Sequence, residues 1–425
     1  MPRLAYQRCT LAGRCYNLNM PVSDQQLKLL AFPYSKYDAL IADGSIRSGK
    51  TSISFVAYID WLMREFNGQE FIAMGVTVRT AERNIIEPYT RLGYAQKRYK
   101  LDYNRGRGVL TIKQGDRTNY VQVFGAPNER SYEPILGMTA AGCFIDQVEL
   151  CNRKAVETAL GRCSVDGSRY FFNCNPAYPT HWFREEWILQ AKQKNALYLR
   201  FTMDDNPALS ETIKTRFRNQ YHGVFYQRYI LGEWVVAEGL VYQFDSPDEY
   251  TCSREEAQAV SMGRWYISID YGITNPFAAI LWRVTPNRAY AVKEYYFDSK
   301  KEGRRKTDAE HLQSVKELAR GHVIEDIVID PSATSFKEEI YRDGQFGVID
   351  ADNNVLEGIM VTDQMLHDGS VKISEDCANW IREMGLYRWD DKEGRDKVIK
   401  SEDHACDAGR YMCNTILKYE LSGYE

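Results

Sequence analysis

The sequence lacks several features that would settle the class of the protein at once. Its ten cysteines form no Cys-x-x-Cys pair, and histidine is scarce at six residues. No run of about 18 apolar residues occurs, and residues 1–20 contain no apolar central stretch. From these absences we expect no zinc or disulfide framework, no membrane-spanning helix and no secretory signal. We expect most cysteines to be reduced core thiols of a cytosolic protein.

An excess of charge is also missing. Lys and Arg number 54 against 58 Asp and Glu, which gives a net charge of −4 and a pI of about 6.0. This balance argues against a basic protein that coats nucleic acid. It leaves room for a nucleic-acid enzyme with a local basic channel, because binding responds to the local potential. A chain of 425 residues predicts two or three domains, at roughly 150 residues per domain.

The first half of the chain alternates between strand-like and helix-like segments. The expected strands are Ala39–Ala42, Glu70–Gly75, Tyr120–Gly125, Cys143–Asp146 and Arg169–Asn173. The expected helices are Lys50–Phe66, Thr80–Arg91 and Asn152–Arg162. This alternation predicts an α/β domain with a mostly parallel sheet. Val109–Lys113 and Tyr120–Gly125 resemble a hairpin inserted into it.

A domain junction is expected after Gly232-Glu233-Trp234, and we divide the chain into residues 1–240 and 241–425. The second part opens with three strands that look antiparallel, followed by a helix, a strand ending in Asp, and a last helix. These segments are Tyr266–Asp270, Phe277–Arg283, Ala289–Tyr296, Ala309–Arg320, Val323–Asp330 and Glu402–Leu417. This order is typical of an RNase H-like fold.

A phosphate-binding loop stands between the first strand and the first helix. Gly44-Ser45-Ile46-Arg47-Ser48-Gly49-Lys50-Thr51 matches the pattern G-x-x-x-x-G-K-[ST]. In such a loop the backbone N–H groups surround the phosphates of ATP, the lysine contacts the β- and γ-oxygens, and the hydroxyl of Thr51 binds Mg²⁺. Arg47 either neutralises γ-phosphate charge within its own subunit or faces solvent.

A second acid for Mg²⁺ is expected at Asp146, which ends an apolar strand. Many such ATPases place Glu directly after this Asp, but here the next residue is Gln147. Gln can orient water but cannot accept its proton. Either Glu149 reaches round to act as the base, or hydrolysis is slow. Asn173 and Asn175, at the end of the next strand, either sense the γ-phosphate or form an ordinary strand-to-loop turn.

Three carboxylates of the second half stand where an RNase H-like fold would gather them. Asp270 and Asp330 end strands, and Asp407 lies on the last helix. Such nucleases hold two divalent metals about 3.5–4 Å apart, and bound Mg²⁺ or Mn²⁺ makes crowded carboxylates tolerable. His404 shares a helix face with Asp407, so it can bind metal or move a proton. Asp403 lies at the expected helix start, where N-capping is the simpler role.

Taken together, these segments resemble the large subunit of a tailed-phage terminase over nearly the whole chain. The resemblance rests on the order and spacing of its motifs. They are Gly44–Thr51, Phe144–Glu149, Phe171–Pro176 with His181-Trp182-Phe183, Gly232-Glu233-Trp234, Ile269–Gly272, Ile329–Pro331 and Asp403–Ala408. The resemblance implies an N-terminal P-loop translocation ATPase, a coupling motif at Asn173–Pro176 and a C-terminal endonuclease. Gln147 departs from the family, whose members generally carry Glu.

The resemblance also implies partners and a place of action. These are double-stranded DNA, a portal protein, a small terminase subunit and a procapsid, with no membrane. It implies a monomer in solution, a ring on the portal, and action in the cytoplasm of the infected bacterium rather than in the mature virion. Gln26, or its neighbour Gln25, stands where related ATPases read adenine. Arg130 lies near an arginine that acts on a neighbouring subunit in some relatives, although a surface arginine is the simpler interpretation.

Two other classes of function fit the same motifs. One is a P-loop helicase or repair translocase fused to a nuclease, and the other is a DNA-binding packaging scaffold with a degenerate ATPase, as Gln147 would allow. Two charged segments have no assigned role. Lys300–Lys306 is either a phosphate contact or a solvated loop, and Trp389–Lys397 resembles a hairpin beside the cutting site.

Overall fold

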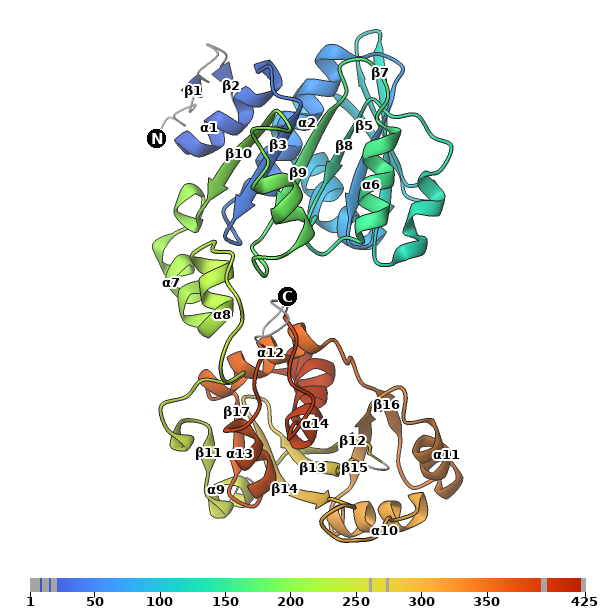
Figure 1. Cartoon of the computed structure of the whole chain (residues 1–425), viewed down its shortest axis with the longest axis vertical. Helices are drawn as coiled ribbons and strands as arrows, with labels where there is room; N and C mark the ends of the chain where they lie inside the picture. The colour runs from blue at the N-terminus through green and yellow to red at the C-terminus, as the bar shows by residue number, and fades with distance from the viewer. Residues whose placement is uncertain are drawn as a thin grey trace. The chain divides into compact units, whose positions relative to one another are not determined.

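The computed structural model describes residues 8–9, 15–16, 21–259, 262–272, 275–390 and 396–421 of the chain. It divides into two compact units (Figure 1). The first unit comprises Met1–Asn219 with Val224–Val236, and the second comprises Gln220–Gly223 with Ala237–Glu425. The short strands β1 (Arg8–Cys9) and β2 (Cys15–Tyr16) pair antiparallel at the start of the first unit.

An eight-stranded sheet forms the centre of the first unit, in the order β10-β3-β9-β8-β4-β7-β6-β5. Neighbours from β10 to β7 are parallel, and β6 is antiparallel to both β7 and β5. The strands are β3 (Ala39–Gly44), β4 (Glu70–Gly75), β5 (Lys100–Asn104), β6 (Val109–Gln114), β7 (Arg117–Gly125), β8 (Gly142–Ile145), β9 (Arg169–Cys174) and β10 (Ala196–Phe201). The expected mostly parallel sheet is confirmed, and the expected hairpin is β6–β7 at one end of it.

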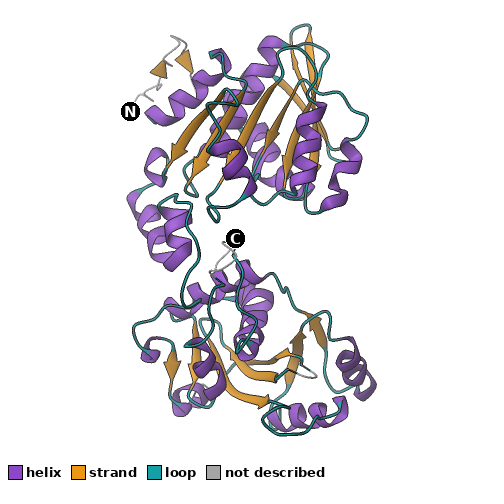
Figure 2. Cartoon of the chain, viewed as in Figure 1, coloured by secondary structure: helices purple, strands orange, loops and turns teal. Residues whose placement is uncertain are grey.

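Helices cover both faces of this sheet (Figure 2). Alternate strand residues explain why: Leu40 and Ala42 of β3 pack into one apolar core, and Ala39 and Ile41 pack into the other. The first core takes side chains from α1 and α2, and the second from α6 and η4. The helices are α1 (Asp24–Ala31), α2 (Lys50–Glu65), α3 (Val78–Ala81), α4 (Glu87–Arg91), α5 (Gly93–Arg98), α6 (Arg153–Arg162), α7 (Glu211–Gln220) and α8 (Gly223–Phe225).

Shorter helical turns complete the first unit. Those of 3-10 type are η1 (Phe32–Tyr34), η3 (Glu129–Ile135) and η5 (Met203–Asp205), and those of π type are η2 (Glu82–Ile86), η4 (Arg184–Ile188) and η6 (Tyr226–Ile230). The helix expected at Thr80–Arg91 begins earlier, at Val78, because Thr77 provides a capping box. It continues as α3, the π turn η2 and α4.

A seven-stranded sheet forms the centre of the second unit, in the order β11-β17-β14-β13-β12-β15-β16. Within it β13 is antiparallel to β12 and β14, whereas β12, β15 and β16 are parallel. The strands are β11 (Thr251–Cys252), β12 (Arg264–Asp270), β13 (Phe277–Val284), β14 (Ala289–Phe297), β15 (Ile324–Ile329), β16 (Val348–Asp350) and β17 (Val371–Ser374). The order of the five strands from β14 to β16 is that of an RNase H-like fold, as expected from the sequence.

Helices pack on both faces of this sheet as well. Side chains of α10 and α11 form a core with β12, β13 and β15, and α14 lies against β12 and β13. The helices are α9 (Arg254–Ala259), α10 (Asp308–Leu318), α11 (Thr334–Asp343), α12 (Val355–His367), α13 (Ala378–Met384), α14 (His404–Met412) and α15 (Lys418–Glu420). The turns η7 (Pro247–Glu249) and η8 (Cys413–Leu417) complete the unit.

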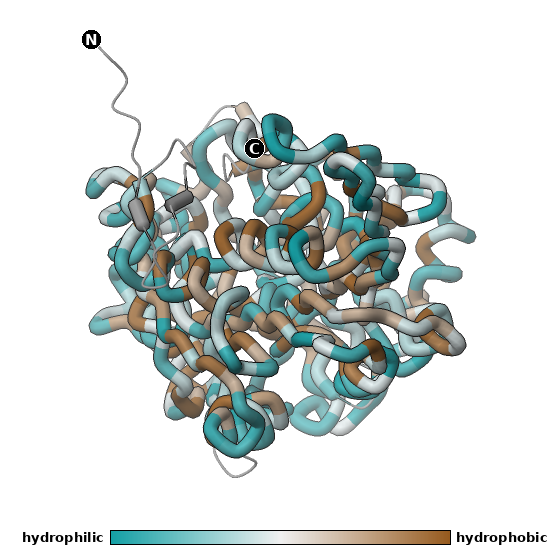
Figure 3. Tube along the Cα trace, turned by 90° about the horizontal axis from the view of Figure 1, so that it is seen from above, coloured by the Kyte–Doolittle hydropathy of each residue, from teal (hydrophilic) through white to brown (hydrophobic). Residues whose placement is uncertain are grey.

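Hydrophobic and hydrophilic stretches alternate closely along the described part of the trace (Figure 3). Among the described residues, no helix is both long and apolar enough to cross a membrane. Eight cysteines of the described part are free thiols, and six of them are buried, whereas Cys163 and Cys252 are half-buried. Most of these cysteines are therefore core thiols, as expected from the sequence.

Candidate nucleotide and metal sites

The phosphate-binding loop follows β3, whose six residues are all buried. Gly44 has a φ of +131°, and a Cβ on it would lie 1.9 Å from the carbonyl oxygen of Phe201, so only glycine fits there. Arg47 and Gly49 also have positive φ, of 57° and 78°. The loop therefore turns through the left-handed conformations typical of backbone sites that bind anions. Its first two N–H groups, of Ser45 and Ile46, donate to carbonyl oxygens of neighbouring segments instead.

Lys50 begins α2 and is almost fully buried at 6% exposure. Its amine donates to the carbonyl oxygens of Gly44 (3.1 Å) and Ser45 (2.9 Å) and to Oδ1 of Asn175 (2.7 Å). Burial lowers the pKa of this ammonium group. The buried hydroxyls of Ser45 and Ser48 have no hydrogen-bond partner among the described residues. A bound phosphate would supply both a counter-charge and the missing acceptors.

Thr51 and Asp146 lie side by side at the end of the site nearest β8. Oγ1 of Thr51 donates to Oδ1 of Asp146 at 3.0 Å, and Nδ2 of Asn173 donates to the same oxygen at 3.3 Å. Adjacent ligands of octahedral Mg²⁺ stand about 2.9 Å apart, given Mg–O distances of 2.0–2.1 Å. The hydroxyl and the carboxylate therefore fit two neighbouring positions around Mg²⁺. Burial raises the pKa of Asp146, and hydrogen bonds from Thr51 and Asn173 oppose this rise.

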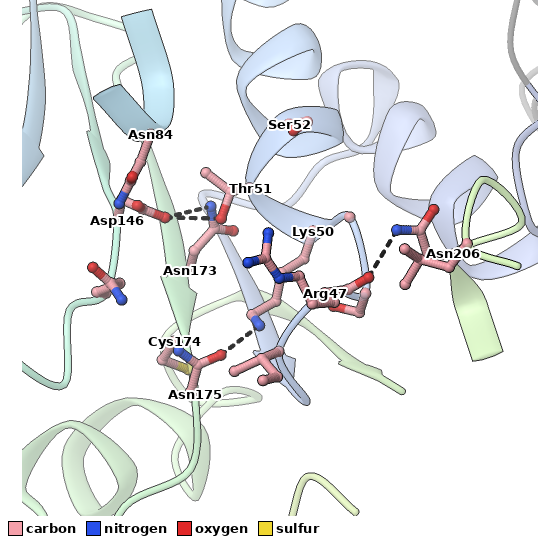
Figure 4. Close-up of a pocket in the computed structure, with 15 residues that line it drawn as sticks. Arg47, Lys50, Thr51, Ser52, Asn84, Asp146, Asn173, Cys174, Asn175 and Asn206 are labelled. Carbon is pink, nitrogen blue, oxygen red and sulfur yellow. Dashed lines mark hydrogen bonds between the residues drawn. The ribbon is translucent and has the colours of Figure 1, made fainter. Parts of the chain in front are cut away.

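A cavity of about 560 Å³ opens beside these groups (Figure 4). Figure 4 shows the Lys50 amine directed at Asn175, and Thr51 and Asn173 directed at Asp146. The lining residues are Ile46–Ser52, Asn84, Asp146, Gln147, Asn173–Asn175, Asn206 and Leu209. Three strands and the loop thus bring most of the expected residues of the first site to one cavity, but Gly44, Ser45, Glu149 and Gln26 are not among those that line it.

Asn84 belongs to this cavity although sequence reasoning missed it. It lies in the π turn η2 and lines the cavity together with Asp146, whose pKa it helps to lower. Short π turns inside helices often occur at functional sites. No sequence signal marks Asn84, because its helix follows a different strand from that of Asp146.

The two candidates for orienting or activating water take different positions. Gln147 lines the cavity and has a φ of +53°, which is rare for a residue other than glycine. Glu149 accepts a hydrogen bond from Nδ2 of Asn175 at 3.3 Å, while its buried Oε2 atom has no partner among the described residues. Burial raises the pKa of Glu149 to about 8. Asn175 therefore connects Lys50 to Glu149 through its two amide atoms.

Gln26 supports the loop from outside the cavity. Its Nε2 atom donates to the carbonyl oxygen of Ser48 at 3.3 Å, and its Oε1 atom accepts from the backbone N–H of Ser23 as part of a capping box. Gln25 instead donates to the carbonyl oxygen of Arg200. Gln26 therefore supports the loop through a direct hydrogen bond. Its recognition of adenine stays a prediction.

The two arginines named from the sequence also differ in placement. Arg47 lines the cavity, its guanidinium lies 5.2 Å from the ring centre of Phe217, and its carbonyl oxygen accepts from Asn206 at 2.7 Å. Arg130 is exposed in η3.

A buried acid connects the loop to the Gly232-Glu233-Trp234 motif. Asp43, with no exposed surface, accepts hydrogen bonds from the indole N–H of Trp234 (2.9 Å) and the hydroxyl of Tyr198 (2.8 Å). Burial raises the pKa of Asp43. In the same segment, the backbone N–H of Ile46 donates to the carbonyl oxygen of Tyr229 at 3.0 Å. The motif therefore fixes the loop from behind.

The second candidate site lies where β12 and β15 end beneath α14. The hydroxyl of Tyr411 lies 3.1 Å from Oδ2 of Asp330 and 3.5 Å from Oδ1 of Asp270, so it links the two carboxylates. Burial, reinforced by the charge of Asp407, raises the pKa of Asp270. Burial also acts on Asp330, but hydrogen bonds from Ser332 outweigh it and lower the pKa of that carboxyl group. An all-oxygen, doubly acidic site of this kind fits Mg²⁺ or Mn²⁺.

Asp407 is held differently from the other two acids. Its Oδ1 accepts from the Arg410 guanidinium at 2.9 Å, and its Oδ2 accepts from the Lys400 amine at 3.0 Å. No direct hydrogen bond between Asp407 and the other two acids occurs in the described residues. The structure thus brings Asp270 and Asp330 to one hydroxyl and keeps Asp407 nearby, with its charge balanced by two cations.

His404 contacts Asp270 directly, with Nδ1 2.9 Å from Oδ2. Burial lowers the pKa of His404, but the hydrogen bond to Asp270 outweighs it, and the net shift is upward. Tyr411, which sequence reasoning missed, lies seven residues after His404 and so shares its helix face. The 404, 407, 411 spacing was the signal that could have identified it.

The expected N-capping role of Asp403 is wrong. Asp403 occupies the N-cap position of α14, but its side chain makes no capping hydrogen bond. The buried carboxylate of Glu383 on α13 does so instead, accepting from the backbone N–H groups of Ala405 (2.6 Å) and Cys406 (3.2 Å). A residue from another helix thus sets the position of α14, which spacing along the chain cannot reveal.

The two unassigned charged segments resolve in part. Lys306 donates to the hydroxyl of Tyr295 at 3.0 Å, and the rest of Lys300–Lys306 is exposed. Trp389 and Val398 form an antiparallel bridge, as a hairpin would, but residues 391–395 lie outside the described part of the chain.

The fold and these two sites define a class. A P-loop NTPase unit precedes an RNase H-like unit whose sheet carries paired carboxylates. No protein-family model matches the chain.

Comparison with solved structures identifies the family. The large terminase of a thermophilic bacteriophage is 40% identical to this chain, with a TM-score of 0.87 over 94% of this chain and 100% of that one. Its complex with ADP gives 40% identity and a TM-score of 0.84, over 93% and 99% of the two chains. Its complex with ATP-γ-S gives 40% identity and a TM-score of 0.83, over 93% of this chain and 100% of that one. The chain therefore belongs to the phage large terminase family, and its function is in phage DNA packaging.

A curated relative is more distant. The terminase large subunit of Escherichia phage T5 is 24% identical over 156 residues, which span 35% of this chain and 35% of that protein. The aligned part is thus about a third of either chain.

Proposed function

We propose that this protein uses ATP hydrolysis to move double-stranded DNA into a procapsid and cuts the DNA with a divalent-metal-dependent endonuclease. One observation carries the proposal. A single chain holds a phosphate cradle with an adjacent acid and, in its other unit, a carboxylate pair on an RNase H-like sheet, and the two sites share no residue. Residues 1–240 would then supply the motor activity and residues 241–425 the nuclease activity.

In the motor, ATP would occupy the cradle formed by residues 44–51. The relative from the thermophilic bacteriophage was solved with ADP and with ATP-γ-S, which supports nucleotide binding here. Lys50 would contact the β- and γ-phosphates, and Thr51 and Asp146 would hold Mg²⁺. When bound, the ion offsets the charge that develops on the phosphates. Arg47, already at the cavity, would add a second positive charge near the γ-phosphate.

Hydrolysis also needs a group that takes a proton from water. Glu149 is our candidate because its carboxyl, with a pKa near 8, can accept a proton at neutral to mildly basic pH. Gln147, at the cavity wall, would orient the water. Asn173 contacts Asp146, and Asn175 contacts Lys50. Loss of the γ-phosphate would therefore change hydrogen bonds at the end of β9. This supports their expected coupling role.

In the nuclease, Asp270, Asp330 and Asp407 would hold two Mg²⁺ or Mn²⁺ ions. Such ions activate water and stabilise the leaving oxygen. His404 would orient Asp270 through their hydrogen bond or move a proton. For Asp407 to become a metal ligand, at least one of its contacts with Lys400 and Arg410 has to be exchanged.

Family membership supports the remaining expectations. The portal, the small terminase subunit and the procapsid are the proposed partners, with a monomer in solution and a ring on the portal. The proposed place of action is the cytoplasm of the infected bacterium, before the virion is mature.

Two substitutions test the proposal. Lys50→Ala should abolish DNA-stimulated phosphate release and leave metal-dependent plasmid cleavage intact, and Asp270→Ala should do the reverse. Lys113→Ala, an exposed lysine on β6, and Asp350→Ala, an exposed strand-end acid on β16, are matched controls that should change neither. If Asp270→Ala cut plasmid as well as the wild type, the nuclease assignment would be wrong.

The same assays separate the two alternative functions. Displacement of an annealed oligonucleotide by the ATP-hydrolysing protein would favour a helicase or repair translocase. No phosphate release in the presence of both DNA and portal protein would favour a scaffold with a degenerate ATPase.

A further inference from the structure

A third cluster of chemically active side chains lies in the second unit, and neither proposed reaction uses it. His222 belongs to the segment Gln220–Gly223, which the chain division assigns to the second unit. Asp363 and His367 lie one turn apart on α12 and so share a helix face. One ligand atom from each of the three residues lies within 4.8 Å of the others.

The distances within this cluster suit a small ion. Nδ1 of His367 is 3.5 Å from Oδ1 of Asp363, and Nδ1 of His222 is 3.9 Å from Oδ2. Tetrahedral ligands of Zn²⁺ stand about 3.3 Å apart, since Zn–N and Zn–O bonds are 2.0–2.2 Å long. Nδ1 of His367 also lies 2.9 Å from the backbone carbonyl oxygen of Asp363. Exchange of that contact and small side-chain adjustments would bring all three groups to one ion.

The polar atoms of the cluster are incompletely satisfied. Nδ1 of His222 is buried and has no hydrogen-bond partner among the described residues. Asp363 is 7% exposed, and its carboxylate has the two imidazoles as its ionic neighbours. A single bound cation would satisfy both the buried carboxylate and the unpaired ring nitrogen.

The aromatic surroundings restrict one ring and leave the other adjustable. Phe244 stacks on His367 at 4.1 Å between ring centres, and His222 stacks on His367 at 3.8 Å with an interplanar angle of 9°. Parallel rings cannot both direct in-plane lone pairs at one ion, so one ring has to tilt. His222 has a side chain that is 33% exposed, against 16% for His367, and is the ring with room to do so.

We propose that His222, Asp363 and His367 bind one divalent transition-metal ion of the Zn²⁺ class, with water as the fourth ligand. Two imidazoles and one carboxylate form a donor set that zinc accepts and that Mg²⁺ does not favour. Bound there, the ion ties the segment Gln220–Gly223 to α12 within the second unit. The proposal is independent of the two activities proposed above.

Metal titration of the full-length protein tests this site. The protein is first stripped with a chelator, and Zn²⁺ is then titrated by calorimetry in excess Mg²⁺, which occupies all-oxygen sites but competes poorly for imidazole. A parallel titration with Co²⁺ reports the ligand type, because thiolate ligands would add a strong sulfur charge-transfer band. The wild type should bind one equivalent without that band and should melt at a higher temperature when loaded.

The variants His222→Gln and His367→Gln should weaken Zn²⁺ binding roughly tenfold or more. His322→Gln is the matched control, because His322 also stacks on an aromatic ring, that of Trp265, but has no acidic partner among the described residues. It should bind as the wild type does. Metal-free melting curves of His222→Gln and the wild type should coincide, since His222 is partly exposed, so a lost equivalent cannot come from misfolding. Equal binding by wild type, His222→Gln and His367→Gln, or no binding by the wild type, would overturn the proposal.

Discussion

At the scale of single residues, the least usual part of the first site is the pair Gln147 and Glu149. Gln147 lies at the cavity wall in a strained backbone conformation, and Glu149 lies behind it with a buried, unpaired oxygen. A strained residue at a cavity points to function. Our proposal divides the orienting of water and the acceptance of its proton between these two residues, because a Gln side chain cannot accept a proton.

The first prediction concerns the identity of the base. Glu149→Gln should lower kcat for ATP hydrolysis by roughly 10²–10⁴-fold, because a neutral amide cannot accept a proton. In the wild type, kcat/KM, which reports the nucleotide-free enzyme, should rise with pH and level off above about 8, where Glu149 is ionised. Phosphate release measured across this pH range checks both. A large rise in the rate of ATP hydrolysis in Gln147→Glu, together with normal turnover in Glu149→Gln, would show that Glu149 is not the base.

The second prediction concerns the stability of the nucleotide-free protein. The pKa of Glu149 is about 8 in the folded chain, above its ordinary value of 4.5. Between these two pKa values the folded state holds a proton that the unfolded state has lost. The contribution of this group to the free energy of unfolding is therefore full below about pH 4.5 and declines as the pH rises toward 8. Glu149→Gln removes this loss. In chemical unfolding, the free energy of unfolding of the variant should rise relative to that of the wild type between about pH 5 and pH 8. A constant difference across that range would contradict the assigned pKa.

The sequence identified those residues whose type and position in a strand or loop reveal their role. Lys50, Thr51 and Asp146 belong to a local pattern, and the structure brings them to one cavity. Asn84 approaches Asp146 only across the fold, so local spacing gave no reason to choose it. Tyr411 differs, because its spacing from His404 and Asp407 places it on their helix face, although only the fold shows that it reaches Asp330. A residue such as Asn84 needs the tertiary structure before it can be named.

At the scale of elements, α14 depends on a carboxylate that it does not itself contain. Glu383 caps its first backbone N–H groups and also accepts from the hydroxyl of Tyr296 at 2.8 Å. The N-terminal end of α14 carries His404, so the cap fixes the height of the helix above Asp270.

The third prediction follows from this cap. Glu383→Ala should reduce the free energy of unfolding by about 1–3 kcal/mol, because buried donors and Tyr296 lose their acceptor. It should also reduce plasmid cleavage, since His404 and Asp407 would no longer be held in place. Asp403→Ala is the control and should cost less stability, because its side chain caps nothing. Urea unfolding and cleavage rates measure the two effects. Equal losses in both variants would show that Glu383 has no special role.

Strands were easier to predict than helix ends. The expected Glu70–Gly75 strand matches β4, because a short apolar run between turn signals is typical of a buried strand. The last helix, expected from Glu402, starts at His404 and changes to a π turn at Cys413. Helix ends depend on caps such as Glu383, which come from elsewhere in the chain.

At the scale of the whole molecule, two sheets with separate cores carry separate sites. The strand order of each was predictable in class, because alternating strands and helices favour a parallel sheet and three leading antiparallel strands favour the RNase H-like order. The Zn²⁺-type cluster was not predictable, because His222 and Asp363 are 141 positions apart and belong to no pattern.

The fourth prediction uses this separation. Calorimetric melting should show two transitions, of which ATP-γ-S raises one and Mn²⁺ raises the other. A ligand at a hundred times its Kd adds about 2.7 kcal/mol to the unit that binds it. Lys50→Ala should abolish the first shift and Asp270→Ala the second. A single transition that both ligands move would show that the units unfold as one.

The hydrogen bond between Trp234 and Asp43 has a practical consequence. The indole N–H points at a buried carboxylate directly behind the phosphate cradle, and Trp234 is one of eight tryptophans in the chain. Indole fluorescence is sensitive to nearby charge, so filling of the cradle should alter the emission of this ring. Subtracting the spectrum of Trp234→Phe would isolate that signal. The protein would then contain its own optical reporter of nucleotide occupancy, readable in a stopped-flow instrument without any added dye.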